Sequence, residues 1–347
     1  MLISLQARRC PAREMAGVDF SSLNAAAAGI ISAMKSGRRI QIENRLALAS
    51  AALVLAVIAL ERLPGESWWL TLLLVYSPQE VWAIPSLLLA AYFILRCRWW
   101  LAAGGLVLAG VVLMVLVGMP LPRPAPQSLS GLRVLTWNLY YGRGGPALPR
   151  LTLDVWPDVI CLQEADPWAT MQLDGMLRLP QFRNWYSKVC GELVILSRFP
   201  LRRLGTTHSA LWASANVDGR EVVIVNVHLA LPLRIPDVLN PAQIRAANDL
   251  RSHQVAQILA KVPSDRPVVV CGDFNTPPNA RIYRYLTSVL TDSFRRCGHG
   301  LGLSYMRGFP LVRIDHIFVS RNLRPVRCWL PKVSASNHRP VCADVEL

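Results

Sequence analysis

The stretch "VVVCGDFNTPP", residues 268–278, is the best guide to the fold of this chain. Its valine run lies between Pro267 and Gly272 and predicts a strand that is buried on both faces. Asp273 and Asn275 follow. Because residues two positions apart on an extended segment point the same way, both side chains are expected to project from the carboxyl end of the strand, where α/β folds bind ligands. Asp and Asn are also common in turns after strands, so other parts of the chain must decide between a site and a simple turn.

Similar apolar segments recur in the C-terminal part of the chain. They predict strands over residues 132–140, 158–164, 191–197, 220–231, 266–275 and 313–320. A helix is predicted over residues 240–262, with Asn240 as its N-cap and Pro241 at its first position. The mixture of elements predicts an α/β domain over residues 132–347.

The N-terminal part has a different composition, because residues 46–119 are almost wholly apolar. They predict three membrane-spanning helices, over residues 46–63, 81–100 and 99–119, each near the length of about 20 residues that a bilayer requires. The segment 68–76 is too short to span and contains Trp and Tyr, which prefer the membrane interface. A soluble helical hairpin is the alternative, and the sustained lack of charge argues against it.

The placement of arginine indicates an orientation for these helices. Basic side chains precede the first span and separate the second from the third, at Arg38, Arg39, Arg45, Arg96 and Arg98. The positive-inside rule therefore places residues 1–45 and the turn at Arg96 in the cytoplasm. A Pro-rich spacer over residues 120–131 leads to the C-terminal domain, which three crossings place outside the cytoplasm. The sequence thus predicts a multi-pass protein of the cell membrane.

Charge and cysteine content limit the function only loosely. The chain has a net charge of +15, and residues 128–347 hold 26 basic and 16 acidic side chains. A basic surface favours phosphate-rich partners such as nucleic acid or anionic lipid, but an arginine-rich chain can also carry this charge for solubility alone. Cys161 and Cys271 lie in apolar strands and are expected to be buried. In an oxidising compartment, disulfide bonds are open to four further cysteines, namely Cys190, Cys297, Cys328 and Cys342.

Polar side chains recur at the ends of the predicted strands. They are Asn138, Gln163 with Glu164, Asn226 with His228, Asp273 with Asn275, Asp315 with His316, and Asn337 with His338. Each group alone is explained as a satisfied polar residue or a turn. Six such groups in one domain indicate a functional site.

This set, in this order, resembles the endonuclease/exonuclease/phosphatase superfamily, which has the DNase I-like fold. That family shows an Asn after the first strand, a Gln-Glu pair, a strand-end His, Gly-Asp-x-Asn, an Asp in an Ile-Asp-x-Ile context and a final Ser-Asp-His. Residues 191–201, "GELVILSRFPL", resemble its central segment. The resemblance covers about residues 130–347. It implies a four-layer sandwich of two mixed sheets with outer helices and a site at one end.

The resemblance also implies the chemistry of phosphate-ester hydrolysis. Such a reaction needs neutralised phosphoryl oxygens and an activated water. Mg²⁺, with Mn²⁺ as the alternative ion, suits a site made of oxygen ligands. Glu164 is the first metal ligand, with Asn138 beside it as a carbonyl ligand or phosphate contact. Asp273 orients or deprotonates the attacking water, and Asn275 hydrogen-bonds a phosphoryl oxygen.

Histidines complete the implied site. His228 and His338 flank the phosphate as donors, and Asp315 pairs with His338 and raises its pKa. His316 is expected to point away from Asp315, because neighbours on a strand alternate, and is interpreted as structural. Asn337 departs from the family pattern, which has Asp there. It offers the metal an oxygen without a charge.

The sequence therefore predicts a membrane-anchored, Mg²⁺-dependent phosphoesterase that cleaves phosphodiesters or phosphomonoesters, including a nuclease. Substrates of the superfamily include DNA, RNA, inositol phosphates and sphingomyelin, and the motifs do not choose among nucleic acid, a phospholipid headgroup and an inositol phosphate. The alternative is a catalytically weakened domain that binds a phosphate ligand or a protein at the membrane. Asn337 is the residue that supports this alternative. The oligomeric state is left open.

Overall fold

The computed structural model describes residues 20–121, 131–232, 237, 239–305 and 311–347. The predicted spacer over residues 120–131 therefore lies almost entirely outside the described residues. The chain divides into two compact units, Met1–Ala49 and Ser50–Leu347. The second unit contains the sheets and every side chain of the predicted site.

The apolar region forms helices that differ from the predicted spans. They are α1 (Phe20–Arg62), α2 (Trp69–Tyr76), α3 (Ile84–Leu95) and α4 (Trp99–Val115), with short 3₁₀ helices η1 (Gly65–Ser67) and η2 (Gln79–Ala83). Among the described residues, Ser36–Arg62 of α1 is long and apolar enough to cross a membrane. A second candidate arises only if α2 and Gln79–Leu95, bent by 89° at their junction, count as one broken span. Three spans are thus not confirmed.

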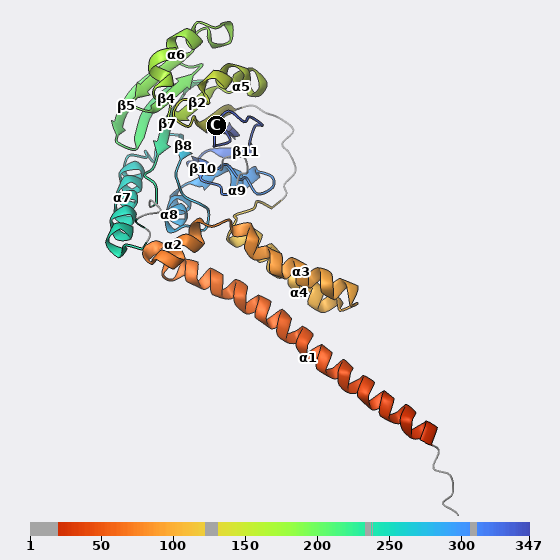
Figure 1. The fold of residues 1–347 in the computed structure, drawn as a ribbon. Helices are drawn as coiled ribbons and strands as arrows, with labels where there is room; N and C mark the ends of the chain where they lie inside the picture. Colours follow the sequence, from red (N-terminus) through yellow and green to blue (C-terminus); the bar gives the residue numbers. More distant parts are fainter. Residues whose placement is uncertain (1–19, 122–130, 233–236, 238, 306–310) are drawn as a thin grey trace, which may run out of the picture. The chain divides into compact units, whose positions relative to one another are not determined.

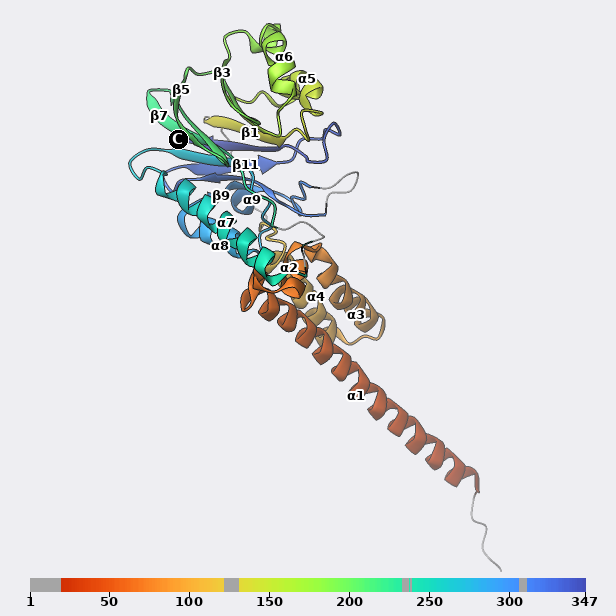
Figure 2. The same ribbon diagram turned by 60° about the vertical axis from the view of Figure 1, so that its left-hand side comes forward.

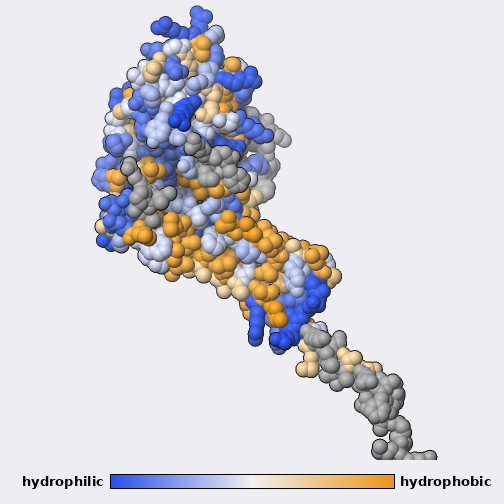
Figure 3. All heavy atoms as spheres, in the orientation of Figure 1, coloured by the Kyte–Doolittle hydropathy of each residue, from blue (hydrophilic) through white to orange (hydrophobic). Residues whose placement is uncertain are grey.

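The bend between α2 and Gln79–Leu95 has a local cause. Ser77 is extended at ψ 160°, as expected for a residue before proline, and Pro78 cannot continue α2. Beyond it, α3 ends after 12 residues at Arg96, and Cys97 adopts a left-handed φ of 55°. α4 has 17 residues and packs closely on α3. Gly105 of α4 allows this close approach, because a Cβ atom there would lie only 3.0 Å from the Cβ atom of Ala90. Apolar side chains, orange in Figure 3, gather over these helices.

Two six-stranded mixed sheets form the C-terminal domain (Figure 1). The first has the order β11-β12-β1-β2-β4-β3 and consists of β1 (Leu132–Asn138), β2 (Val159–Gln163), β3 (Tyr186–Cys190), β4 (Leu193–Ser197), β11 (Arg324–Trp329) and β12 (Val341–Glu346). The second has the order β5-β6-β7-β8-β10-β9 and consists of β5 (Leu201–Thr207), β6 (Ala210–Val217), β7 (Arg220–His228), β8 (Val268–Asp273), β9 (Thr291–Asp292) and β10 (Asp315–Val319). The pairs β1/β2 and β7/β8 are parallel.

Helices cover the outer faces of both sheets, and Figure 2 shows the resulting layers. They are α5 (Leu148–Val155), α6 (Trp168–Leu177), α7 (Pro241–Ala260) and α8 (Arg281–Val289). The short α9 (Ser293–Cys297) instead packs Phe294 into the apolar cluster between the sheets. One apolar cluster fills the space between the sheets and includes the buried Cys161 and Cys271. A second cluster joins α5 and α6 to the first sheet, and a third joins α7 and α8 to the other. The predicted sandwich of two mixed sheets with outer helices is confirmed.

The local predictions agree with these elements. All six predicted strands occur, as β1, β2, β4, β7, β8 and β10. The predicted helix is α7, and the Asn240 side chain accepts hydrogen bonds from the backbone nitrogens of Ala242 and Gln243 at 3.0 and 3.4 Å. Three of the cysteines considered for disulfide bonds are free thiols, namely Cys190, Cys328 and Cys342. No disulfide bond is therefore seen at these positions.

Candidate active site

The two parallel strand pairs deliver their carboxyl ends to one end of the sandwich. Asn138 pairs with Gln163 at the end of β1/β2, and His228 pairs with Asp273 at the end of β7/β8. Antiparallel β10 starts at the same place, because Asp315 pairs with Asp273. Residues that are far apart in the sequence therefore meet at one edge of both sheets.

Asp273 lies at the centre of this cluster and is 1% exposed. Its Oδ2 atom accepts a hydrogen bond of 2.9 Å from Nδ2 of Asn138. The Nε2 atoms of His228 and His338 lie 3.8 and 3.7 Å from the same oxygen. One carboxylate flanked by two imidazoles is thus the core of the site.

Asn275 is close to Asp273, but for a different reason from the predicted one. β8 ends at Asp273, and Asn275 adopts a left-handed φ of 46°. The Asp273 Oδ1 atom accepts the backbone N–H of Asn275 at 2.8 Å, which turns the chain. The alternation of a strand therefore does not apply to this pair. The Asn275 side chain instead donates from Nδ2 to the carbonyl oxygen of Leu229 at 2.9 Å.

Gly272 allows β8 to come close to β7 beside Asp273. Its φ is 146°, and a Cβ atom there would lie 1.9 Å from the carbonyl oxygen of Val227. Only glycine tolerates this contact. The glycine of the Gly-Asp-x-Asn motif is therefore required by the backbone geometry.

His338 forms the predicted pair with Asp315. Its Nδ1 atom lies 2.9 Å from Oδ2 of Asp315, which also accepts a hydrogen bond of 2.7 Å from the Ser304 hydroxyl. Burial lowers the pKa of His338, but the carboxylates of Asp315 and Asp273 outweigh burial and raise that pKa to about 9. The imidazole is therefore protonated at neutral pH and directs Nε2–H toward Asp273.

His228 has a matching partner that the sequence analysis missed. Its Nδ1 atom lies 2.7 Å from Oε1 of Glu192, the residue before β4. Burial lowers the pKa of His228, and Glu192 together with Asp273 raises it to about 9. Glu192 is the second residue of the segment "GELVILS", and its place directly before an apolar strand was the available signal.

Glu164 and Asn138 form the acidic side of the site. Glu164 follows β2 with a left-handed φ of 47°. Its Oε1 accepts a hydrogen bond of 2.9 Å from Nδ2 of Asn138, and its Oε2 accepts the backbone N–H of Tyr141 at 3.2 Å. The Asn138 Oδ1 atom accepts the backbone N–H of Tyr140 at 2.9 Å. The amide nitrogen of Asn138, not its oxygen, thus faces both carboxylates.

Two overlapping groups of side chains have ligand atoms within 4.8 Å of one another. They are Glu164, His228 and Asp273, and Asp273, Asp315 and His338. Carboxylate oxygens from separate strands suit a hard divalent cation, so these residues fit the metal that the family implies. Asn337, the residue before His338, is half-buried, and its Oδ1 atom lies 3.3 Å from the Ser336 hydroxyl. This hydroxyl also donates to the carbonyl oxygen of Asn138 at 2.8 Å and so holds the segment beside β1.

Three other strand-end residues have structural roles. Gln163 donates from Nε2 to Oδ1 of Asn226 at 2.6 Å, and Asn226 donates to the carbonyl oxygens of Leu162 and Val194, which joins the two sheets. His316 hydrogen-bonds the carbonyl oxygen of Thr276 at 2.8 Å and points away from Asp315, as predicted. Burial lowers the pKa of His316 to about 4, so its ring stays neutral.

The sequence is similar to those of known proteins. A family model described as the Endonuclease/Exonuclease/phosphatase family matches residues 135–338. Carbon catabolite repressor protein 4 homolog 3 of Arabidopsis thaliana is 25% identical over 158 residues, which are 38% of this chain and 32% of that protein. The chain thus spans about a third of the length of this relative.

One solved structure supports the fold, and a second is similar at a lower score. An AP endonuclease from Archaeoglobus fulgidus superposes with a TM-score of 0.51 at 15% identity, over 62% of this chain and 100% of that chain. An endonuclease/exonuclease/phosphatase from Beutenbergia cavernae DSM 12333 has a TM-score of 0.48 at 19% identity, over 62% and 71% of the two chains. Because the family model covers more than half of the sequence, the chain belongs to the endonuclease/exonuclease/phosphatase family.

Proposed function

We propose that this chain is a membrane-anchored, Mg²⁺-dependent phosphoesterase whose catalytic domain lies outside the cytoplasm. Membership of the family supports the hydrolase class. The observation that carries the proposal is the Asp273 carboxylate, which lies within 3.8 Å of two Nε2 atoms whose rings are each backed by a second carboxylate. This arrangement provides a base that is flanked by two proton donors.

The two imidazoles bind and orient the phosphate. With pKa values of about 9, His228 and His338 both carry a proton on Nε2 at neutral pH. Glu192 and Asp315 hold the opposite ring nitrogens, which fixes the direction of each Nε2–H group. Charge-assisted donors of this kind bind phosphoryl oxygens, and one of them can give its proton to the leaving oxygen.

Asp273 orients or deprotonates the attacking water. Asn138 holds the carboxylate in place from one side, and the backbone of Asn275 holds it from the other. The Asn275 amide keeps one N–H for a phosphoryl oxygen, because its nitrogen uses the other on Leu229.

The carboxylate of Glu164 is the expected metal ligand, with the amide oxygen of Asn337 as a candidate neighbour. The ion, Mg²⁺ or alternatively Mn²⁺, supplies charge neutralisation and a lowered pKa for bound water. Asn138 is assigned to positioning the two carboxylates, since its amide nitrogen bridges Glu164 and Asp273. The substrate is a phosphate ester from nucleic acid, a phospholipid headgroup or an inositol phosphate.

Full-length protein in detergent tests the reaction. It should hydrolyse at least one of plasmid DNA, a generic phosphodiester, sphingomyelin and an inositol phosphate in the presence of Mg²⁺. EDTA should abolish turnover, and added Mg²⁺ should restore it. Robust hydrolysis in excess EDTA would overturn the metal-dependent mechanism.

Membrane anchoring through the N-terminal helices is part of the same proposal. Ser36–Arg62 supports it, and the arginines at Arg38, Arg39 and Arg45 favour a cytoplasmic N-terminus. One or three crossings then place Leu347 outside the cytoplasm, whereas two crossings place it inside. A reporter that is active only outside the cytoplasm should be active when fused after Leu347, and strong activity of a cytoplasm-only reporter would contradict this topology.

Asn337 favours a second candidate function, a weakened domain that binds a phosphate ligand or a protein at the membrane. This form would bind inorganic phosphate or a phosphodiester without turnover at any Mg²⁺ concentration. Calorimetric binding beside the hydrolysis assay separates the two functions.

A further inference from the structure

The loop that carries Asn275 is held from behind by Arg251 of α7. The Arg251 side chain is 0% exposed. Its Nη2 atom donates to the carbonyl oxygen of Asn275 at 2.8 Å and lies 3.3 Å from that of Phe274. It also donates to the Thr276 hydroxyl. One guanidinium nitrogen thus contacts three consecutive residues directly after Asp273.

The other terminal nitrogen of Arg251 contacts the apolar region of the chain. Its Nη1 atom donates to the hydroxyl of Tyr76, the last residue of α2, and the guanidinium carbon lies 5.7 Å from the centre of the Tyr76 ring. The Tyr76 hydroxyl donates in turn to Oε1 of Glu66 at 3.2 Å. A continuous series of polar contacts therefore runs from Glu66 through Tyr76 and Arg251 to the loop of the site.

Glu66 is fixed between the two helices that cover the second sheet. Its Oε2 accepts the backbone N–H of Arg281, the first residue of α8, at 2.9 Å. Its carbonyl oxygen accepts Nδ2 of Asn248 on α7 at 2.8 Å. Both ribbon views show α2 beside α7 and α8 (Figures 1 and 2). The segment from Glu66 to Tyr76 is thus built into the domain that carries the site.

Further contacts lie at the far end of the same loop. Asn279 donates from Nδ2 to Oε2 of Glu61 at 3.0 Å and to the carbonyl oxygen of Val75 at 3.1 Å. A Cβ atom at Gly118, just beyond α4, would lie 2.9 Å from Pro278. Residues of α1 and α2, and one residue just beyond α4, therefore contact the far end of the loop at Pro278 and Asn279.

Arg251 depends on its contacts because a buried guanidinium without partners is costly. Its Nε atom has no hydrogen-bond partner among the described residues. Loss of the Tyr76 hydroxyl leaves Nη1 without its acceptor as well, so Arg251 must move or admit water. Either change releases the carbonyl oxygens of Phe274 and Asn275.

We propose that Tyr76 and Arg251 are positioning residues, through which the helix α2 of the apolar region sets the loop of the active site. Their effect on turnover rests on the proposed function, whereas their effect on the loop does not. Neither residue touches the reacting atoms. A consequence is that residues 128–347 alone lack the partner of Arg251 and are expected to have a displaced loop.

Tyr76→Phe in the full-length protein in detergent is the direct test, because it removes one hydroxyl and keeps the ring. We expect kcat to fall by about 10-fold while KM changes by less than about twofold, since loop placement affects reaction geometry more than substrate capture. Hydrogen exchange measured by mass spectrometry should become faster in peptides covering residues 274–280 and stay unchanged in β1. Tyr285→Phe, at a half-exposed tyrosine of α8, should behave as wild type in both measurements.

A double-mutant cycle separates positioning from general destabilisation. If Tyr76 acts through Arg251, Tyr76→Phe should lower kcat little further in an Arg251→Lys background. Wild-type exchange in residues 274–280 of Tyr76→Phe would overturn the proposal, whether or not the enzyme is active. A wild-type protein without turnover would refute the proposed function instead, and the exchange result would still decide on the loop.

Discussion

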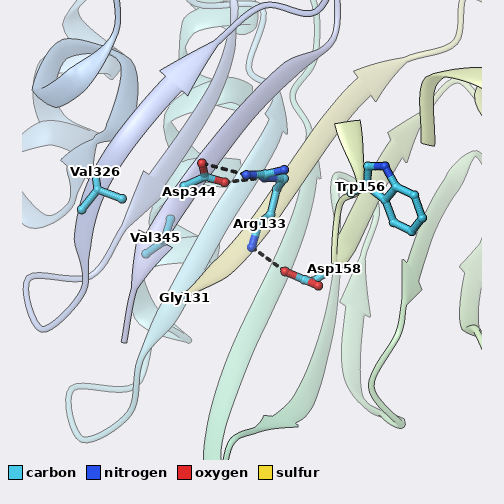
Figure 4. Close-up of a pocket in the computed structure, with 7 residues that line it drawn as sticks. All are labelled: Gly131, Arg133, Trp156, Asp158, Val326, Asp344 and Val345. Atoms are coloured by element: carbon cyan, nitrogen blue, oxygen red, sulfur yellow. Dashed lines mark hydrogen bonds and ion pairs between the residues drawn. The ribbon is translucent and has the colours of Figure 1, made fainter. Parts of the chain in front are cut away.

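Both ends of β1 carry a cluster of charged groups, and the two clusters are built in opposite ways. At its start, Arg133 binds Asp344 through Nε and Nη2 at 2.5 and 3.1 Å, and its backbone N–H binds Asp158 at 2.8 Å. A cavity of about 160 Å³ with Trp156 at its edge lies there (Figure 4). At its end, Asn138 lies between Glu164 and Asp273.

The difference lies in what balances the carboxylates. Asp344 has the guanidinium of Arg133 in a two-bond pair, and Asp158 has Arg198 at 3.6 Å. The charge of each of these carboxylates is therefore balanced by an arginine of the protein itself. At the other end, four carboxylates lie around only two imidazoles, those of His228 and His338. The carboxylates belong to Glu164, Asp273, Asp315 and Glu192. A net negative charge remains even when both rings are protonated, and a bound cation is the natural complement.

Neutralising one carboxylate at each end gives the largest expected contrast. Asp273→Asn removes the base and should lower kcat by at least ~10²-fold with little change in melting temperature. Asp344→Asn should leave kcat within about twofold and lower the free energy of unfolding by roughly 1–3 kcal/mol, because Arg133 loses a charged partner. Steady-state kinetics and thermal melts of both variants measure these effects.

The two variants test the contrast between the two ends of β1 jointly. Full activity of Asp273→Asn would remove this carboxylate from the chemistry. A loss of turnover in Asp344→Asn without a loss of stability would show that the Arg133 cluster takes part in function, and the contrast between the two ends would fail.

Much of this contrast was visible in the sequence. Asn138, Asp273 and Asp315 end or begin apolar strands, so periodicity placed them and the family motifs assigned them. The sequence analysis missed Glu192, because the role of this residue depends on the pairing of β4 with β2. No local sequence pattern specifies that sheet order. The contact of Tyr76 with Arg251 joins residues that are 175 positions apart, and the span predicted over residues 81–100 is longer than α3, which has 12 residues.

The histidines extend the contrast to pH. In the metal-free protein, the contributions of His338 and His316 to stability depend on pH in opposite directions. The pKa of His338 is raised to about 9, so its contribution to stability is complete below its unfolded pKa of about 6.5 and is lost as pH rises through about 9. The pKa of His316 is lowered to about 4, so its contribution is complete above about pH 6.5 and is lost as pH falls toward 4.

Each effect is on the order of 3 kcal/mol, since one pKa unit corresponds to about 1.4 kcal/mol. Chemical unfolding of the EDTA-treated protein between pH 4.5 and 9.5 measures both. His338→Gln should reduce the decline at alkaline pH to the part that His228 causes, because the pKa of His228 is also raised to about 9. His316→Phe should flatten the decline at acid pH. An unchanged alkaline decline in His338→Gln would mean that other groups cause it.

The smallest expected effect comes from adding a carboxylate at the site end. Asn337→Asp should lower the Mg²⁺ concentration that gives half-maximal activity by several-fold, because the number of charged ligands tunes the affinity of oxygen sites. The attraction of the cation offsets the desolvation of the new carboxylate, so the side chain should stay ionised at neutral pH. A rise in kcat is expected only if the wild type is not saturated with metal.

Asn216→Asp is the matched control, because Asn216 is exposed near the end of β6, where its oxygen accepts the backbone N–H of Gly219 at 2.9 Å. It adds the same charge away from the site and should leave the Mg²⁺ midpoint unchanged. Melting curves are needed beside the titrations, since a carboxylate at position 337 without a donor would destabilise the domain. An unchanged midpoint in a well-folded Asn337→Asp protein would exclude Asn337 from the metal site. The reason to consider a weakened enzyme would then be lost, and the excess of negative charge would rest on the four carboxylates alone.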